Sequence, residues 1–254
     1  VARSDMRLTL ALLLFALPLQ AATYYVATTG NDGNPGTQAQ PWRTVQRAAN
    51  AVGAGDTVYV QTGTYDERVT INGASGTAGN RISLLANGAV TLYGFNVQRP
   101  YYTLNGFKVT GVLAPLNAIV LLQPAAHGTQ LLSLTIEPVL ESGGIFMLQG
   151  AVWGVEPSNC IVRSCLFTNM QYHGLQCQGN NHLIESNTWF SPYGQDAIRA
   201  FANNTTYRAN VFTNWSNLTG SANHPDIVQS WTVVGAAPGA GYYATNCVFE
   251  SNLI

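Results

Sequence analysis

Charge is what this chain has least of. Asp, Glu, Lys and Arg make up 9% of its 254 residues, against about a quarter in ordinary soluble domains. The formal net charge of -1 excludes the basic surface expected of a protein that binds nucleic acid. Lysine is nearly absent, because Lys108 is the only one. Any mechanism that uses a lysine base therefore has a single candidate.

Long apolar runs are also missing. The longest mainly apolar stretch covers residues 8–17, which is too short to cross a bilayer comfortably. It follows Met6 and Arg7 and precedes Ala21, an order typical of a secretory signal, with a membrane anchor or buried helix as the alternative. We expect residues 1–22 to be a signal peptide with upstream residues. The mature protein is then exported, extracellular or periplasmic, monomeric and free of the membrane.

Cysteines are few, and their pairing is open. Export permits disulfides, and four cysteines allow three pairings that sequence cannot choose between. Small buried thiols that fill a core are an equally good interpretation. The four are Cys160, Cys165, Cys177 and Cys247.

A short phrase recurs in the second half of the chain. Its copies are 161–167, 183–189, 207–212 and 244–249. In each copy an aromatic residue follows two positions after an anchor, and the anchors are Cys165, Asn187, Asn210 and Cys247. They are 22, 23 and 37 residues apart. A strand-sized phrase at such a period is typical of a solenoid, and we expect the long last interval to form a protruding loop around 214–223 or 235–242.

Each coil carries a second strand between copies of the phrase. These strands are 118–121, 144–147, 174–177, 197–200 and 227–230. Residues 102–109 and 131–136 resemble earlier copies of the phrase itself. Two strand columns per coil favour a parallel β-helix over a sandwich, which would show hairpin turns. Stacked Asn187 and Asn210 then predict an amide ladder, because buried amides need hydrogen-bond partners.

One helix precedes these strands. Apolar residues at helical spacing follow Pro41, at Val45, Ala48, Ala49 and Val52. A solenoid needs a cap that keeps its first coil out of water, and this helix is placed to provide it. We expect one all-β domain over 23–254, with the cap within about 24–60 and with truncation at the C-terminus.

The N-terminal residues carry a family resemblance. Residues 24–37, the helix after Pro41 and the segment 55–67 resemble the opening of secreted bacterial members of the pectate-lyase-like right-handed parallel β-helix proteins. These include family-nine-like polysaccharide lyases. The resemblance extends over 24–254 and implies a right-handed parallel β-helix. It implies less about activity, because the fold hosts lyases, hydrolases, epimerases and non-catalytic proteins.

The second strand column gathers the scarce ionisable residues. His173, Asp196 and Asp226 directly precede its strands on successive coils, and His224 lies on an approach turn. Three positions later come Gln176, Arg199 and Gln229. Strand alternation directs Arg199 and its neighbours outward. The alternative is that both aspartates cap turns and the histidines lie at the surface.

This cluster suits an acidic polysaccharide. β-Elimination needs a cation for the uronate carboxylate, a base and an acid. Arg199 fits the first role, and His173, His224 or Tyr193 fit proton transfer. Asp196 and Asp226 could hold Ca²⁺, which prefers oxygen ligands.

Binding residues and rival functions complete the prediction. Gln176, Gln229, Tyr193 and Trp231 are candidates for substrate contact, since flat rings suit sugar faces, whereas the period of Trp189 places it in the core. The resembling lyases use a lysine base and several aspartates around calcium, but Lys108 lies in the other strand column. A non-catalytic glycan-binding or structural surface protein is the rival. A glycoside hydrolase with Asp196 and Asp226 is third, because carboxylates about 5 Å apart suit retention.

Overall fold

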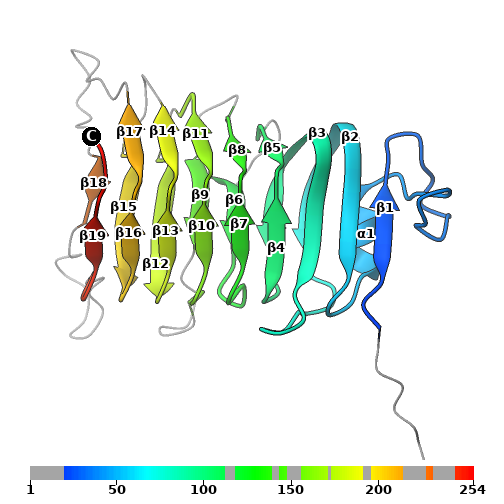
Figure 1. Ribbon diagram of the computed structural model, residues 1–254, viewed down its shortest axis with the longest axis horizontal. Coiled ribbons are helices and arrows are strands. Elements are labelled where there is room, and N and C mark those ends of the chain that lie inside the picture. Colours follow the sequence, from blue (N-terminus) through cyan, green and yellow to red (C-terminus); the bar gives the residue numbers. More distant parts are fainter. Residues whose placement is uncertain are drawn as a thin grey trace, which may run out of the picture.

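The protein is a parallel β-helix with one short helix. The computed structural model describes residues 20–111, 118–138, 143–147, 156–170, 173–190, 196–213, 227–230 and 244–254. Its strands form one 19-stranded sheet whose neighbours pair in parallel. Successive coils lie side by side along the long axis (Figure 1). The predicted fold class is confirmed.

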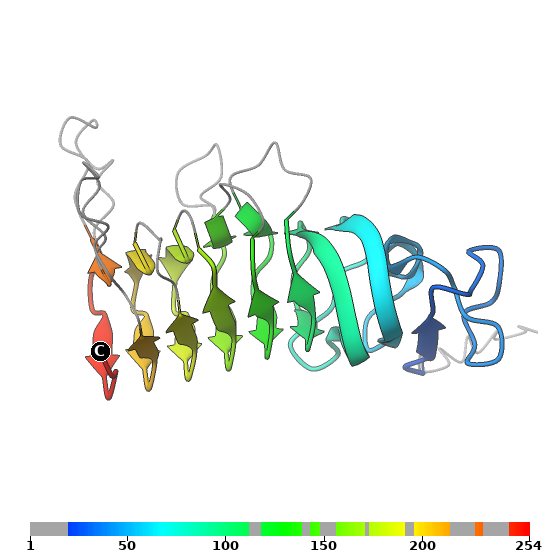
Figure 2. The same ribbon diagram turned by 90° about the horizontal axis from the view of Figure 1, so that it is seen from above.

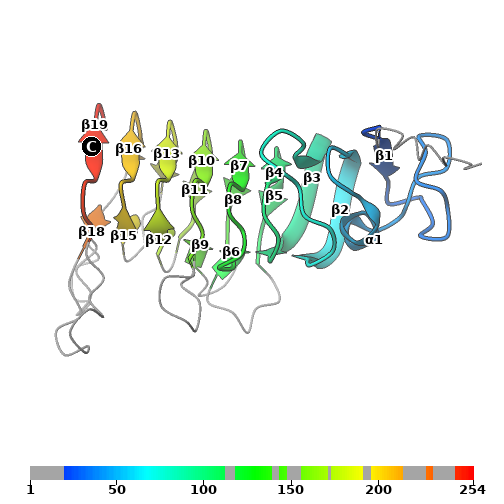
Figure 3. The same ribbon diagram turned by 90° about the horizontal axis from the view of Figure 1, so that it is seen from below.

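Three stacks of strands, rather than the two predicted, form the walls. The first contains β1 (Thr23–Val26), β4 (Tyr102–Asn105), β7 (Gln130–Leu132), β10 (Ile161–Arg163), β13 (Leu183–Glu185), β16 (Thr206–Arg208) and β19 (Val248–Glu250). The second contains β5 (Lys108–Val109), β8 (Thr135–Ile136), β11 (Leu166–Thr168), β14 (Thr188–Phe190) and β17 (Val211–Thr213). The third contains β6 (Ala118–Leu122), β9 (Gly143–Met147), β12 (Leu175–Asn180), β15 (Ile198–Asn203) and β18 (Val228–Gln229). Two long strands, β2 (Thr57–Ile71) and β3 (Ile82–Val97), run through all three (Figures 2 and 3).

The extra stack arises from a bend inside the repeat phrase. Ser164, Ser186 and Ser251 have φ of 55°, 55° and 52°, and Ala209 has 51°. A residue in this left-handed region cannot continue a strand. Each phrase therefore divides into two strands, such as β10 and β11. Serine and alanine carry no strong left-handed signal, which is why the sequence did not predict the bend.

The last copy of the phrase was predicted in the wrong register. Tyr207 pairs with Phe249, so Cys247 does not follow Asn210 in its column. The next rung is Asn252, which lies 42 residues after Asn210 and bonds to it. The loops expected within this interval lie outside the described residues.

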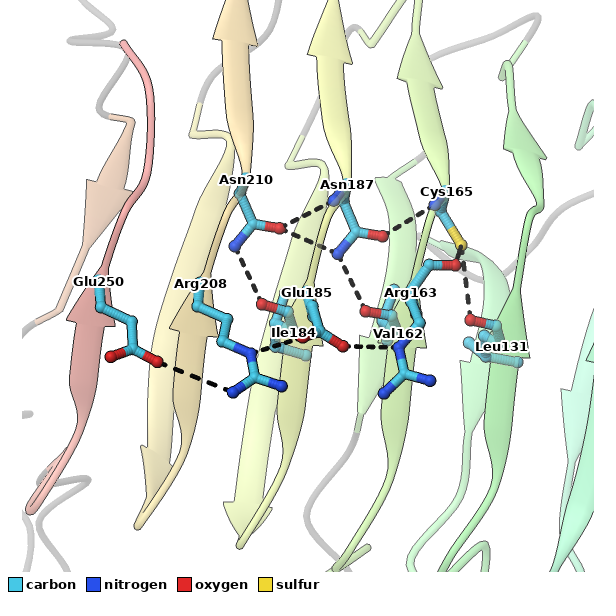
Figure 4. Close-up of polar contacts among 10 residues, drawn as sticks. All are labelled: Leu131, Val162, Arg163, Cys165, Ile184, Glu185, Asn187, Arg208, Asn210 and Glu250. Carbon is cyan, nitrogen blue, oxygen red and sulfur yellow. Dashed lines mark hydrogen bonds and ion pairs between the residues drawn. The ribbon is translucent and has the colours of Figure 1, made fainter.

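The amide ladder is confirmed and is longer than predicted. Asn187 Oδ1 accepts the Cys165 N–H at 2.9 Å, and Asn210 Oδ1 accepts the Asn187 N–H at 3.0 Å. Asn252 Oδ1 accepts the Asn210 N–H at 3.0 Å. Each amide nitrogen in turn donates to a backbone carbonyl, as Asn187 does to Val162 (Figure 4). The ladder therefore pairs buried polar groups across successive coils.

The helix α1 (Val45–Ala51) lies at the N-terminal end against β2 (Figure 1). Thr44 is its N-cap and accepts the Arg47 N–H. The Glu67 carboxylate accepts the Val45 and Gln46 N–H groups at 2.7 and 2.9 Å. The predicted helix is confirmed, and the apolar face predicted for it is buried.

Aromatic rings fill the interior. Trp189 is stacked between Phe167 and Phe212, with ring centroids 4.5 and 4.9 Å away, which confirms its predicted place in the core. All four cysteines are free thiols, and burial raises the pKa of Cys160 and of Cys165 to about 12.

The predicted signal peptide falls largely on residues 1–19, outside the described part. No helix among the described residues is long and apolar enough to cross a membrane.

Candidate functional site

The outer wall of the third stack carries the predicted cluster. Leu175 and Ile198 pair with each other and are buried in the core. Gln176 and Arg199, one position later, pair as well and are partly exposed. Because side chains alternate along a strand, Arg199 lies on the outer face as predicted.

A chain of three groups joins β12 to β15. Arg199 Nε lies 2.8 Å from Asp196 Oδ2, and His173 Nδ1 lies 3.1 Å from the same oxygen. The side chains of His173 and Asp196 are 0% and 3% exposed, whereas Arg199 keeps 21% of its side chain exposed. The buried carboxylate of Asp196 therefore orients the Arg199 guanidinium from its inner side. Of the three groups, only Arg199 reaches the surface.

Backbone contacts fix this geometry. The Gly174 N–H donates to Asp196 O at 3.0 Å, and the Gly144 N–H donates to His173 O at 2.9 Å. A Cβ on Gly174 would lie 2.7 Å from Ala197 O and 2.5 Å from Trp189 Nε1. Glycine is thus required beside His173, because the coils approach too closely for a side chain.

Burial lowers the pKa of His173, and the positive charge of Arg199 acts in the same direction, while Asp196 opposes both. The imidazole is therefore neutral at neutral pH. The neutral, buried imidazole of His173 therefore contacts the Asp196 carboxylate through Nδ1 and adds no charge to the site.

An apolar neighbourhood beside the cluster was not predicted. Ala118, Leu121 and Phe146 form a small buried cluster of their own, apart from the main core. The Phe146 ring lies 6.4 Å from the imidazole of His173. A continuous apolar run in the sequence predicts a strand that is buried on both faces. All five residues of β6 and of β9 are buried in the structure, so this signal could have indicated the neighbourhood.

Four predicted site residues, Tyr193, His224, Asp226 and Trp231, lie outside the described residues. Gln229 pairs through its backbone with Arg199. The structure thus brings together His173, Asp196 and Arg199, with Gln176 beside them.

A family model for the Pel9A-like, right-handed β-helix region matches residues 24–224. The chain belongs to the Pel9A-like β-helix family. Its description adds the right-handed winding, as the sequence predicted. A curated relative, the uncharacterized protein YwoF of Bacillus subtilis (strain 168), is 41% identical over 59 residues, which are 23% of this chain and 12% of that protein.

Three solved structures share the fold of this Pel9A-like chain. A rhamnogalacturonan lyase is 19% identical with a TM-score of 0.55, over 91% of this chain and 62% of its own. The GH136 lacto-N-biosidase from Eubacterium ramulus is 14% identical with a TM-score of 0.59, over 91% and 55%. A mannuronic acid specific polysaccharide family 6 lyase from human gut microbiota is 19% identical with a TM-score of 0.60, over 82% and 51%. The chain spans about half to three fifths of their lengths, and such identities show the fold alone.

The single lysine of this Pel9A-like chain lies away from the cluster. Lys108 is in the second stack and forms an ion pair with Glu137 at 2.7 Å. Arg199 is the cation that the third stack presents beside His173 and Asp196. A lysine base at this cluster would need a second lysine, which the chain lacks.

The described half of the expected calcium site does not suit a metal ion. Asp196 Oδ2 already accepts from the Arg199 guanidinium, whose positive charge repels a cation. Within the described ranges, no three His, Cys, Asp or Glu side chains could share a metal ion. Calcium bound by Asp196 and Asp226 stays a prediction.

Proposed function

We propose that this chain binds an acidic polysaccharide on the outer face of β12 and β15 and cleaves it by β-elimination. The observation that carries the proposal is Arg199, a partly exposed guanidinium oriented by the buried carboxylate of Asp196. In a chain with so little charge, such an arrangement is suited to a specific anion. A planar guanidinium matches a carboxylate geometrically.

The elimination places negative charge on the uronate carboxylate when the neighbouring proton leaves. Arg199 would bind that carboxylate and stabilise the charge as it develops, which is the role of preorganised donors in catalysis. Asp196 holds the guanidinium through Nε, and His173 packs behind Asp196. We therefore assign His173 and Asp196 as positioning residues.

Proton transfer belongs to groups that can touch the sugar. His173 is fully buried, so we assign this task to His224 or Tyr193, the remaining candidates of the sequence. Gln176 pairs with Arg199 in the neighbouring strand and is assigned to substrate hydroxyl groups.

The geometry also informs the rival functions. Hydrolysis by Asp196 and Asp226 needs a carboxyl group able to protonate the leaving oxygen or attack the sugar. Asp196 is 3% exposed and paired with Arg199, which favours elimination over hydrolysis. Non-catalytic glycan binding remains the second candidate, because a single exposed guanidinium supports binding without any base.

The decisive experiment follows unsaturated products by ultraviolet absorbance over pectate, alginate and glycosaminoglycans, with binding measured on the same panel. We expect absorbance to rise with one acidic polymer and activity to fall about 100-fold in Arg199→Gln, the scale of losing one charge-stabilising donor. Binding without absorbance would assign the chain to glycan recognition. New reducing ends without absorbance would assign it to hydrolysis.

Arg208→Gln is the matched control. Arg208 lies in the same coil, on the first stack, where it pairs with Glu185. Its loss should leave the activity unchanged. An equal fall in both variants would contradict a specific role for Arg199.

A further inference from the structure

A cavity at the N-terminal end of the β-helix is separate from the Arg199 cluster. Its volume is about 230 Å³, which is below the roughly 300–1,000 Å³ of sites that hold drug-sized ligands. Three segments of the chain line it, and the lining includes Thr28 after β1, Arg43 before α1, and Thr64, Tyr65, Asp66 and Glu67 of β2. A cavity of this size suits one small ligand.

A bulge in β2 forms one wall of the cavity. Where β3 has only Tyr93, β2 has two residues, Asp66 and Glu67. Bulges redirect side chains and are over-represented beside active sites. Glu67 faces the helix, where its carboxylate accepts two backbone N–H groups at 2.7 and 2.9 Å, whereas Asp66 is exposed. The bulge thus leaves one of its two carboxylates accessible from outside.

The other walls are held close to β2 by backbone contacts. A Cβ on Gly63 would lie 2.6 Å from Thr28 Cγ2, so the loop after β1 lies directly against the strand. On the remaining side, the Asp32 carboxylate accepts the Arg43 and Thr44 N–H groups at 2.8 and 2.9 Å. The cavity is therefore preformed, because each of its three segments is fixed by the fold.

Several polar groups of the lining are open to a ligand. Asp66 Oδ1 accepts the Tyr93 hydroxyl at 3.1 Å, but no described residue bonds to Oδ2. The hydroxyl groups of Thr28 and Thr64 and the guanidinium of Arg43 also have no partner in the described part of the chain, and all three residues are exposed. The cavity therefore offers hydrogen-bond acceptors and donors together.

The charges of the lining indicate the class of ligand. The lining has one cation, Arg43, and two carboxylates, Asp66 and Glu67. An anion would lie against the carboxylates and a cation against Arg43, whereas an uncharged polyol avoids both. Its hydroxyl groups can donate to Asp66, and such charge-assisted hydrogen bonds are strong. The Tyr65 hydroxyl already donates to Gln61 O at 2.9 Å, so its ring is left as an apolar surface for the C–H face of a sugar.

We propose that this cavity binds one uncharged sugar unit at the end of a glycan chain. Asp66 Oδ2 accepts from the sugar hydroxyl groups, Arg43 donates to them, and Thr28 and Thr64 do either. The site does not depend on the elimination assigned to Arg199, so one proposal can fail without the other.

The test titrates the methyl glycosides of glucose, galactose, mannose and rhamnose by ligand-detected nuclear magnetic resonance, with sodium galacturonate as the charged comparison. All titrations use an Arg199→Gln background, so that a uronate bound at that cluster is not counted. We expect at least one neutral glycoside to saturate with a Kd on the order of 1 mM, an ordinary affinity for so few atoms. Galacturonate should bind at least about tenfold more weakly, because like charges oppose it.

Asp66→Asn keeps the size of the side chain and removes its charge. We expect about tenfold weaker binding of the glycoside, the loss of a hydrogen bond to a charged group, with an unchanged unfolding midpoint because Asp66 is exposed. Glu137→Gln is the matched control. It neutralises another partly exposed carboxylate, which pairs with Lys108 in the second stack, and should bind the glycoside as before.

Thr64→Val tests the cavity independently of charge. It removes one hydroxyl group at nearly constant shape, and we expect severalfold weaker binding. No saturation by any of the four glycosides, equal binding by Asp66→Asn and Glu137→Gln, or tighter binding of galacturonate than of every glycoside would overturn the proposal.

Discussion

Two columns of polar side chains lie at the two ends of the first-stack strands. Both contain side chains that accept a backbone N–H of the preceding coil, but the residue types differ. One column contains Cys165, Asn187, Asn210 and Asn252, and the other contains Cys160, His182, Thr205 and Cys247. In the first, Asn187 Oδ1 accepts the N–H of the preceding coil at 2.9 Å. In the second, His182 Nδ1 does so at 3.1 Å. Both columns pair a backbone donor left over where the chain turns.

The difference lies in what each side chain does with its other polar atom. Asn187 and Asn210 donate to carbonyls of the preceding coil, so the amides connect coil to coil. His182 Nε2 lies 3.0 Å from Gln178 O in its own coil. Asn187, His182 and Thr205 thus all accept a backbone N–H of the preceding coil, whereas the thiols in these columns donate to carbonyls. Only the second column includes a histidine.

Breaking the amide column should produce the largest effect. Asn187→Ala leaves the buried Cys165 N–H without its acceptor and removes the amide's own hydrogen bonds to Val162 O and Asn210 Oδ1. An orphaned donor costs roughly 1–3 kcal/mol and each further lost hydrogen bond about 1 kcal/mol, so we expect a loss of about 4 kcal/mol in the free energy of unfolding. Urea denaturation measures it. A loss below about 1 kcal/mol would show that the ladder accompanies the fold without stabilising it.

Acid should distinguish the two columns. Burial lowers the pKa of His182 from 6.5 to about 4, which corresponds to about 3 kcal/mol. Between these values the unfolded chain binds a proton that the folded chain does not, so stability rises with pH. Stability due to His182 is therefore lost as the pH falls from 6.5 towards 4. Urea denaturation at a series of pH values measures the slope.

His182→Asn sharpens this test, because it places an amide where the other column has one. We expect the variant to lose much of the slope between pH 6.5 and 4. His173 should retain a smaller part, since its pKa is lowered in the same direction. An unchanged slope would mean that His182 is not the residue that resists protonation.

The two columns also show how far the sequence could lead. Asn187 and Asn210 predicted a ladder, because buried amides at a regular period need hydrogen-bond partners in the neighbouring coils. The repeated phrase predicted the solenoid. The prediction that Cys247 follows Asn210 was wrong, because cysteines occur in both columns and do not distinguish them. The cue that separates them is the preceding residue, because Asn246, like Asn159 and Asn181, has positive φ at the other corner.

The candidate site was predictable in part. Strand alternation was enough to bring His173, Asp196 and Arg199 together. The complete burial of His173 was not foreseeable, because it depends on how Phe146 and neighbouring coils pack against it.

The corrected register gives a direct comparison of Asn252 with Cys247. Asn252→Ala removes two acceptor contacts to Asn210 and a donor to Tyr207 O, and we expect it to cost about 2 kcal/mol at this partly buried position. Cys247→Ala removes only weak thiol contacts and should cost less than about 1 kcal/mol. Chemical denaturation of both variants checks the order. The reverse order would restore Cys247 to the amide column.

The smallest effect is expected on the outer face of the strands between the two columns. Glu185 lies there between Arg163 and Arg208, at 2.6 and 2.5 Å (Figure 4). The hydrogen bond from Arg208 is the main cause that lowers the pKa of Glu185. The stability that this pairing contributes is therefore fully present above the ordinary carboxyl pKa and is lost as the pH falls through the lowered pKa of the folded state. Both arginines are nearly half exposed, and solvent screens such pairs. Glu185→Gln should therefore cost less than about 1 kcal/mol, and the difference should shrink in high salt. A salt-independent cost as large as that of Asn187→Ala would show that the outer charges, rather than the inner amides, hold successive coils together.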